Sequence, residues 1–163
     1  MNAKMEGYIL NYSDQIARAQ KHLGKLIEEQ FSRIKKMEAI KDFVNYEELD
    51  TIIIGIVGGD GIGPYITAEA QRVLEYLLTE DVQSSKIKFK VIEGLTIENR
   101  AKQNKAIPDD VLAELKECHV ILKGPTTTPR AGDPWPNIES ANVAMRKELD
   151  LFANVRPVKV PEE

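Results

Sequence analysis

The strongest constraint on the fold is an apolar run that leads directly into a glycine-rich loop. Residues 51–57 read TIIIGIV, a continuous β-branched run typical of a parallel strand buried on both faces. The loop GGDGIGP follows at residues 58–64, and apolar residues then recur at helical spacing from Tyr65 to about Thr79. Pro64 suits the first turn of that helix. The order predicts the first strand–helix unit of an α/β domain.

Two further strands and a helix follow in alternation. Residues 87–92 (IKFKVI) alternate apolar and basic side chains, which predicts a second strand. Residues 94–105 form a polar connection, and residues 107–110 (IPDD) open a helix, because acids favour the positive end of its dipole. Residues 118–122 (CHVIL) predict a third, central strand. The fold class is therefore α/β, with a parallel-rich sheet flanked by helices.

The glycine loop allows more than one interpretation. GGDGIGP departs from the register of the dinucleotide fingerprint, and Asp60 inside it would repel a pyrophosphate. The next strand ends at Glu93, about thirty residues on, rather than about twenty as that fingerprint requires. A phosphate cradle is therefore disfavoured. The alternatives are a tight turn that lets the helix pack close to the sheet, and a cleft wall formed through Ile62.

The N-terminal residues 1–50 form a separate helical extension. Residues 13–45 predict a helix capped by Ser13 or Asp14, and Gly24 within it costs about 1 kcal/mol relative to alanine. The run is therefore one bent helix or two. It is either an arm for subunit contact or regulation or, as we favour, an extra helix packed on the domain surface. Its apolar positions are Ile16, Leu23, Ile27, Ile34 and Phe43 or Val44.

Polar residues gather between residues 123 and 159. The third strand leads into KGPTTTP at residues 123–129, and ligands in open α/β sheets bind beyond the carboxyl ends of strands. Threonines also favour loops for purely local reasons. Ser140 then stands at the N-cap position of a helix that runs from Ala141 to Asp150.

That helix carries two different faces. Asn142 and Arg146 are four residues apart and share one face. A neighbouring face anchors the helix to the core through Ala141, Met145 and Leu149. The helix start is a ready anion site, because its free N–H groups and dipole both favour negative charge.

A second arginine follows on a predicted strand from residue 151 to about residue 160. Arg156 lies on this strand, and Pro157 after it marks an edge or a strand end. Either Arg146 or Arg156 alone fits a solvated surface position. Together with Ser140, Asn142 and the threonines they predict a site for a small polycarboxylate, because guanidinium groups match carboxylates bidentately.

Composition and charge exclude several classes of protein. The chain has 163 residues and a net charge of −4, so it lacks the basic footprint of a nucleic-acid binder. No apolar run approaches the roughly 20 residues of a membrane span, and the N-terminus has no secretory pattern. A single cysteine, Cys118, excludes an internal disulfide and suits a reducing compartment. We expect a cytoplasmic protein, with Cys118 and His119 in structural roles.

Residues 52–159 resemble the isocitrate and isopropylmalate dehydrogenases, the decarboxylating β-hydroxyacid dehydrogenases. The resemblance rests on GDGIGP, on KGPTTTP and on the run ESANVAMRKELDLFANVRPVK, in this order and spacing. It implies that the substrate's carboxylates and hydroxyl are bound by Ser140, Asn142, Arg146 and Arg156. It also implies that Thr127, Thr128 and Asn142 lie beside the nicotinamide of the cofactor, and that Ile62 contacts the adenine side.

The implied reaction is oxidative decarboxylation of isocitrate to 2-oxoglutarate with NAD or NADP, assisted by Mg²⁺ or Mn²⁺. The pattern Ser-x-Asn-x-x-x-Arg is similar to the isocitrate branch, whereas the isopropylmalate branch places apolar residues on this face. The alternatives are isopropylmalate, homoisocitrate or tartrate as substrate, or a non-catalytic regulatory subunit that binds a partner through the N-terminal helix. The resemblance also implies a homodimer for the full-length protein.

Two features depart from the family pattern. The loop at residues 130–139 is longer than the compact glycine-rich form in the family. The family's catalytic tyrosine and lysine, its metal-binding aspartates and its main adenosine loop all lie later than Glu163. We therefore expect no catalytic or metal-binding residue in this chain. Residues 51–163 would be the N-terminal part of the large domain, ending at the entry to a missing second domain, in a truncated product that is inactive alone.

Overall fold

The N-terminal arm is one continuous helix. The computed structural model describes residues 3–40 and 44–159, with side chains from Tyr12 onward, and the chain divides into two compact units, residues 1–45 and 46–163. Helix α1 spans Ala3–Ala39, so Ser13 and Asp14 lie inside it and do not cap it. The helix ends before Val44, and Phe43 lies outside the described residues.

The second unit is built on a three-stranded parallel sheet, as predicted. Strands β1 (Ile52–Val57), β2 (Ile87–Val91) and β3 (Val120–Lys123) lie in the order β2-β1-β3. Both pairings are parallel, and Ile54 of the central strand aligns with Phe89 on one side and Val120 on the other. The β-branched run thus occupies the middle of the sheet. The prediction of residues 118–122 as the central strand is wrong, because β1 pairs on both sides whereas β3 pairs only with β1 among the described residues.

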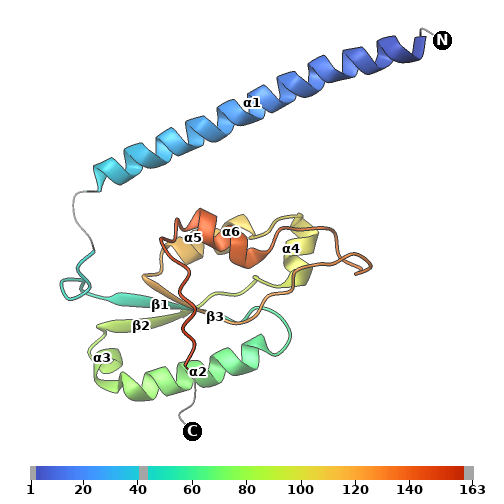
Figure 1. Cartoon of the computed structure of the whole chain (residues 1–163). Helices are drawn as coiled ribbons and strands as arrows, with labels where there is room; N and C mark the ends of the chain where they lie inside the picture. Colours follow the sequence, from blue (N-terminus) through green and yellow to red (C-terminus); the bar gives the residue numbers. More distant parts are fainter. Residues whose placement is uncertain (1–2, 41–43, 160–163) are drawn as a thin grey trace. The chain divides into compact units, whose positions relative to one another are not determined.

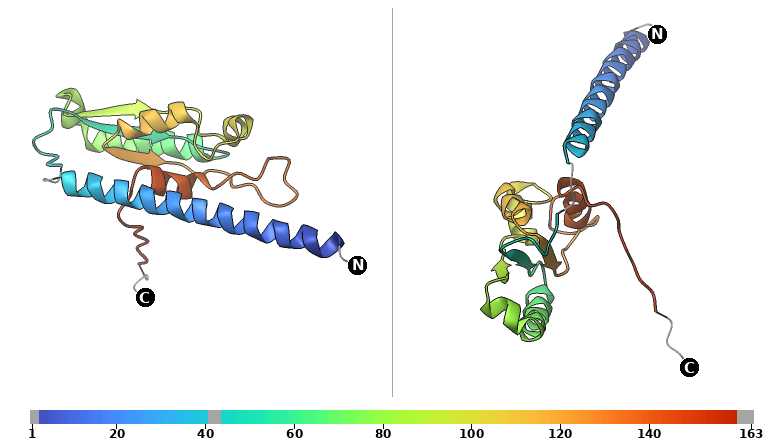
Figure 2. Two further views of the ribbon diagram at one scale, coloured as in Figure 1. Left: turned by 90° about the horizontal axis from the view of Figure 1, so that it is seen from above. Right: turned by 90° about the vertical axis from the view of Figure 1, so that its left-hand side faces the viewer.

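Among the described residues, five helices accompany the sheet: α2 (Gly63–Leu77), α3 (Thr79–Gln83), α4 (Ile97–Gln103), α5 (Asp109–Lys116) and α6 (Ala141–Glu148). Helix α2 lies on one face of the sheet, and α5 and α6 lie on the other (Figures 1 and 2). The core on the α5 and α6 side comprises Val57, Ile92, Leu95, Ile107, Val111, Leu115, Ala141, Ala144 and Met145. This packing joins the start of α6 to the carboxyl end of β1.

Helix α4 was not predicted, because the sequence IENRAKQ has no apolar periodicity. It is held instead by local hydrogen bonds at both ends. The Thr96 hydroxyl accepts a hydrogen bond from the backbone N–H of Asn99 at 3.4 Å, and Asn104 ends the helix in the left-handed conformation, at φ 50°. A threonine N-cap and an asparagine end are recognisable helix signals, but on so short a polar segment they do not stand out.

The prediction of a strand from residue 151 to about residue 160 is wrong for the described part. Residues 151–159 form neither a helix nor a strand and are exposed, while residue 160 lies outside the described residues. An extended segment becomes a strand only when a neighbouring backbone accepts its hydrogen bonds. No described residue provides that pairing.

His119 has the structural role that was predicted. Its Nδ1 accepts a hydrogen bond from the backbone N–H of Ile53 at 3.0 Å, and its own backbone N–H donates to the Ile53 carbonyl at 2.9 Å. The ring therefore extends the β1–β3 pairing by one step beyond the strand.

Candidate functional site

The glycine loop packs directly on the threonine turn, the segment 124–128. The Asp60 N–H donates to the Pro125 carbonyl at 2.8 Å, and the Gly124 N–H donates to the Val57 carbonyl at 2.8 Å. A Cβ atom on Gly59 would lie 2.1 Å from the Pro125 oxygen, and Gly59 has a φ of +73°. Glycine is needed there for close approach of two backbones, which supports the tight-turn interpretation over a phosphate cradle.

Asp60 connects three segments through its carboxylate. Oδ1 accepts a hydrogen bond from the Ile97 N–H at 2.7 Å, at the start of α4, and Oδ2 accepts from the Thr127 N–H at 2.6 Å. The sequence showed only that this acid would repel a phosphate. In the structure its charge is directed at two backbone donors, so Asp60 fixes the threonine turn relative to the glycine loop.

Arg100 holds the same turn from the other side. This side chain is fully buried. Its Nε donates to the Ala106 carbonyl at 2.8 Å. Its two terminal nitrogens donate to the backbone carbonyls of Thr127, at 2.7 Å, and of Glu139, at 2.9 Å. Burial lowers the pKa of Arg100 and Asp60 opposes this effect, but an arginine remains charged at neutral pH.

The Arg100 contacts place the threonine turn beside the start of α6, because Glu139 directly precedes Ser140. The sequence did not predict a role for Arg100. Arg100 lies on the polar segment that was read as a connection, and nothing local distinguishes it from Lys102 or Lys105.

Helix α6 has the two faces that the sequence predicted. Ala141, Ala144 and Met145 are buried against the core, whereas Asn142 and Arg146 are exposed. Ser140 occupies the N-cap position, half-buried, but its hydroxyl makes no capping hydrogen bond. A hydroxyl, an amide and a guanidinium are therefore presented from one helix whose other face is anchored.

The threonine turn presents hydroxyl groups on a fixed backbone. Thr127 is half-buried, and Asp60 and Arg100 hold its N–H and its carbonyl, while Thr128 is exposed. Nearby, Lys123 Nζ donates to the Gly124 carbonyl at 2.7 Å and to the Thr126 hydroxyl at 3.1 Å. Burial lowers the pKa of Lys123, Asp60 opposes this effect and Arg100 adds to it.

The remaining two predicted site residues are Ile62 and Arg156. Ile62 lies within the glycine loop, at the N-cap of α2, and is 64% exposed. Arg156 lies in the exposed segment 151–159, which makes no strand pairing within the described residues. The fold thus gives Ser140, Asn142, Arg146 and the threonines a common scaffold, and it does not place Arg156 on a strand beside them.

Comparison with known proteins identifies the family. Residues 53–163 match the family model described as isocitrate/isopropylmalate dehydrogenase, and they make up more than half of the chain. The chain belongs to this family. The isocitrate/isopropylmalate dehydrogenase family match begins at β1, includes every element of the α/β unit and leaves α1 outside.

Individual relatives agree with the family match. The chain is 38% identical over 108 residues to an isocitrate dehydrogenase [NADP] of Haloferax volcanii, covering 66% of this chain and 24% of the relative. It is 41% identical over 110 residues to that of Archaeoglobus fulgidus, covering 67% and 25%. A 3-isopropylmalate dehydrogenase of Anaeromyxobacter dehalogenans is 34% identical over 109 residues, covering 66% and 30%. The chain thus spans about a quarter of the length of these isocitrate dehydrogenases.

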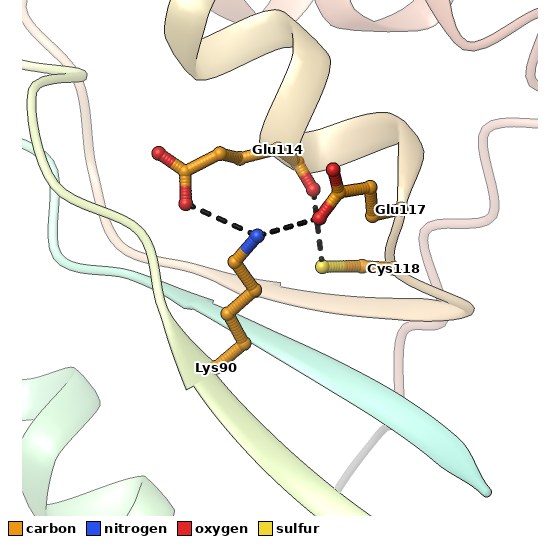
Figure 3. Close-up of polar contacts among 4 residues, drawn as sticks. All are labelled: Lys90, Glu114, Glu117 and Cys118. Atoms are coloured by element: carbon orange, nitrogen blue, oxygen red, sulfur yellow. Dashed lines mark hydrogen bonds and ion pairs between the residues drawn. The ribbon is translucent and has the colours of Figure 1, made fainter.

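Cys118 belongs to a separate cluster beneath α5 (Figure 3). Its Sγ donates to the Glu114 carbonyl at 3.4 Å, and Lys90 Nζ contacts Glu117 at 2.7 Å and Glu114 at 3.2 Å. Burial raises the pKa of the Cys118 thiol, and Lys90 opposes this effect. The hydrogen bond to Glu117 is the main cause that raises the pKa of Lys90. The cluster ties β2 to α5, consistent with a structural role for Cys118.

The described residues contain no group of three or more His, Cys, Asp or Glu side chains that could hold a metal ion. Within this part of the chain, no helix combines the length and the apolar character needed to cross a membrane.

Proposed function

We propose that this chain supplies the substrate-binding half-site of a dehydrogenase that converts isocitrate to 2-oxoglutarate by oxidative decarboxylation. The observation that carries the proposal is the arrangement of α6. Its exposed face presents Asn142 and Arg146 beside the Ser140 hydroxyl, which makes no capping hydrogen bond. Its buried face anchors the helix to the core. The relatives named isocitrate dehydrogenase [NADP] support the choice of substrate.

In this proposal the polar groups of α6 bind and orient a polycarboxylate. The Arg146 guanidinium pairs with one carboxylate, and the free N–H groups of the first helical turn favour a second. Ser140 and Asn142 supply neutral hydrogen-bonding groups for a hydroxyl or carboxylate oxygen. Arg156 adds a second guanidinium from segment 151–159. Holding a substrate in one orientation is itself a large contribution to rate.

The cofactor would lie at the threonine turn. Thr127 and Thr128 are suited to contact a nicotinamide, because Asp60 and Arg100 fix the backbone that carries their hydroxyl groups. Asn142 would lie near the ring and Ile62 on the adenine side. When bound there, a nicotinamide would supply the acceptor for the hydride of the hydroxyl-bearing carbon. The relatives' names favour NADP, with NAD as the alternative.

The glycine loop is a poor fit for a pyrophosphate, because the Pro125 and Gly58 carbonyls occupy the space beside Gly59 and Gly124. The Mg²⁺ or Mn²⁺ implied by the family resemblance has no ligand set among the described residues.

The chain would work as part of a larger enzyme. We propose that residues 1–50 are a helical extension and residues 51–163 the N-terminal part of a large dehydrogenase domain. Because the chain spans about a quarter of the isocitrate dehydrogenases that it matches, turnover would require residues from the rest of such an enzyme. The 163-residue chain alone would then be inactive, and the full-length protein would be a homodimer.

The test is an Arg146→Ala substitution in the full-length enzyme. Loss of a charged hydrogen-bonding partner should weaken isocitrate affinity about 10- to 100-fold, measured by titration. Lys147→Ala removes a neighbouring exposed charge from the same helix and should leave affinity within about twofold. Unchanged isocitrate affinity in Arg146→Ala would refute the anion-site assignment.

A second candidate substrate is isopropylmalate, favoured by the Anaeromyxobacter dehalogenans relative. The polar character of Ser140 and Asn142 speaks against it, because an isopropyl group needs an apolar face. A panel of isocitrate, isopropylmalate, homoisocitrate and tartrate separates the choices by kcat/KM. If the protein binds these four substrates but turns over none of them measurably, it is instead a non-catalytic subunit.

A further inference from the structure

Helix α1 carries an apolar stripe that has no partner in its own unit. Within the described part of residues 1–45, α1 is the only regular element. In proteins, a helix owes most of its stability to packing of its amphipathic face against another surface. The exposed apolar stripe therefore indicates that another protein surface packs against α1. Its side chains are between 42% and 60% exposed: Ile16, Leu23, Leu26, Ile27, Phe31, Ile34 and Met37.

The stripe follows a seven-residue repeat. Positions 16, 23, 30 and 37 are spaced by seven, as are 27 and 34, and the two series are offset by the a/d spacing of a coiled coil. Ile27 and Ile34 then occupy a positions, and Leu23 and Met37 occupy d positions. In parallel coiled coils, β-branched residues at a with leucine-like residues at d favour two strands over three or four.

The flanking charges select the same arrangement. In this repeat Arg33 is at a g position and Glu38, five residues later, is at the following e position. A parallel, in-register pair places each g residue opposite the next e residue of its partner, so Arg33 would face Glu38 of a second copy. The preceding pair is Leu26 with Phe31, which widens the apolar seam. An antiparallel pair would bring g positions opposite g positions, so Arg33 would no longer face Glu38.

The surface of α1 also has a hollow that could accept a side chain of a facing helix. A largely apolar hollow is lined by Leu26, Ile27, Gln30, Phe31 and Ile34. Four of these positions, 27, 30, 31 and 34, have the i, i+3, i+4, i+7 spacing of the hole that accepts one knob of a facing helix. In a parallel, in-register pair that knob is Gln30 of the partner, and a polar residue in the seam specifies register at a cost in stability.

We propose that α1 pairs with α1 of a second copy of this chain as a parallel, in-register two-stranded coiled coil. The two α/β units are then attached to the same end of the coil, because each follows α1 in its own chain. The interface lies outside residues 53–163, which match the family model. It is therefore an association surface additional to the dehydrogenase unit, and it does not depend on which substrate the enzyme takes.

The test is a self-crosslink at a position far from the centre of the stripe. Cys118→Ser leaves a background without cysteine, and Met37→Cys adds one thiol at a d position. In the proposed pair position 37 faces itself, so mild oxidation should convert most of the full chain to a disulfide-linked dimer. Ser32→Cys, on the opposite face of α1, should give less than about a tenth of that yield.

Packing of α1 on its own α/β unit or on another protein would leave both cysteine variants monomeric. An antiparallel pair would place the two copies of position 37 at opposite ends, and would also leave Met37→Cys monomeric. Either result overturns the proposal.

A second measurement needs no crosslink. Light scattering on the full chain should show a dimer whose dissociation constant rises at least about 100-fold when Ile27 and Ile34 are both changed to aspartate. Ser32→Asp with Ala39→Asp adds the same charge on the outer face and should leave the constant within about threefold. A dimer that survives the Ile27 and Ile34 changes, or an unassociated wild-type chain, would contradict the pairing.

Discussion

At the scale of single residues, Asp60 and Arg100 hold one peptide segment from both sides. Asp60 binds the N–H of Thr127 and Arg100 binds its carbonyl. Arg100 also reaches Glu139, so one buried guanidinium sets the spacing between the threonine turn and α6. The candidate site therefore depends on two charged residues that are not themselves expected to touch substrate.

Removing the buried Arg100 side chain should lower the free energy of unfolding by about 3 kcal/mol, because three carbonyls would lose a charged donor. Arg100→Lys should cost less than Arg100→Ala, since a lysine keeps the charge but not the fork. Urea unfolding followed by the fluorescence of Trp135, the single tryptophan, measures both. Arg72→Ala is the matched control, because Arg72 is exposed beside Glu69, and it should stay within about 0.5 kcal/mol. Equal losses in Arg72→Ala and Arg100→Ala would contradict the structural role.

Cys118 should react more slowly with an alkylating reagent in the folded chain than in the same chain unfolded in urea. Burial raises the pKa of the thiol, and only the thiolate reacts. In the folded state the Cys118 thiol therefore stays protonated at pH values above its ordinary pKa of 9.0. The stability that this group contributes is lost as the pH rises through the raised pKa of the folded state. Lys90→Met should move the midpoint of the rate–pH curve further upward. A downward shift would show that Lys90 does not stabilise the thiolate.

At the scale of elements, the glycine loop packs closely against a neighbouring loop. Its contact is the threonine turn, and the close approach is possible because Gly59 and Gly124 have no side chain. The two loops that follow β1 and β3 thus form one packed unit at the carboxyl ends of the strands, where an α/β sheet carries its ligands.

Gly59→Ala should destabilise the α/β unit by about 3 kcal/mol or more, because it combines a left-handed backbone with a clash against the Pro125 oxygen. Gly61→Ala is the matched control: Gly61 has a φ of +59° but open space around its Cβ position. Its cost should be about 1 kcal/mol, from backbone strain alone. Urea unfolding of the two variants measures the difference, and equal costs would show that the two loops do not need this contact.

At the scale of the whole molecule, the proposed coil and the α/β unit should respond differently to protein concentration. A dimeric coil melts at a temperature that rises with concentration, whereas a folded single-chain unit does not. Circular dichroism at 222 nm should therefore contain a concentration-dependent transition from α1, while Trp135 fluorescence should not. The Ile27→Asp, Ile34→Asp variant should lose the first transition and keep the second. A tryptophan transition that moved with concentration would place the dimer interface in the α/β unit.

The sequence by itself determined the parallel sheet, the two-faced helix α6 and the family. These features depend on local patterns: a β-branched run, a glycine loop, and apolar residues four apart beside Asn142 and Arg146. Each pattern predicts which side of a strand or helix is buried. Burial of apolar area is the dominant favourable contribution to folding. That is sufficient to place the elements and to predict most of the candidate site residues.

The tertiary structure decided what lies between the elements. The burial of Arg100 requires carbonyls from Ala106, Thr127 and Glu139 to converge, and no local pattern encodes a meeting of segments so far apart in the chain. Helix α4 exists because its ends are capped and Arg100 is anchored, although its sequence has no apolar period. Segment 151–159 is not a strand, because strand formation depends on a neighbour as much as on the segment itself.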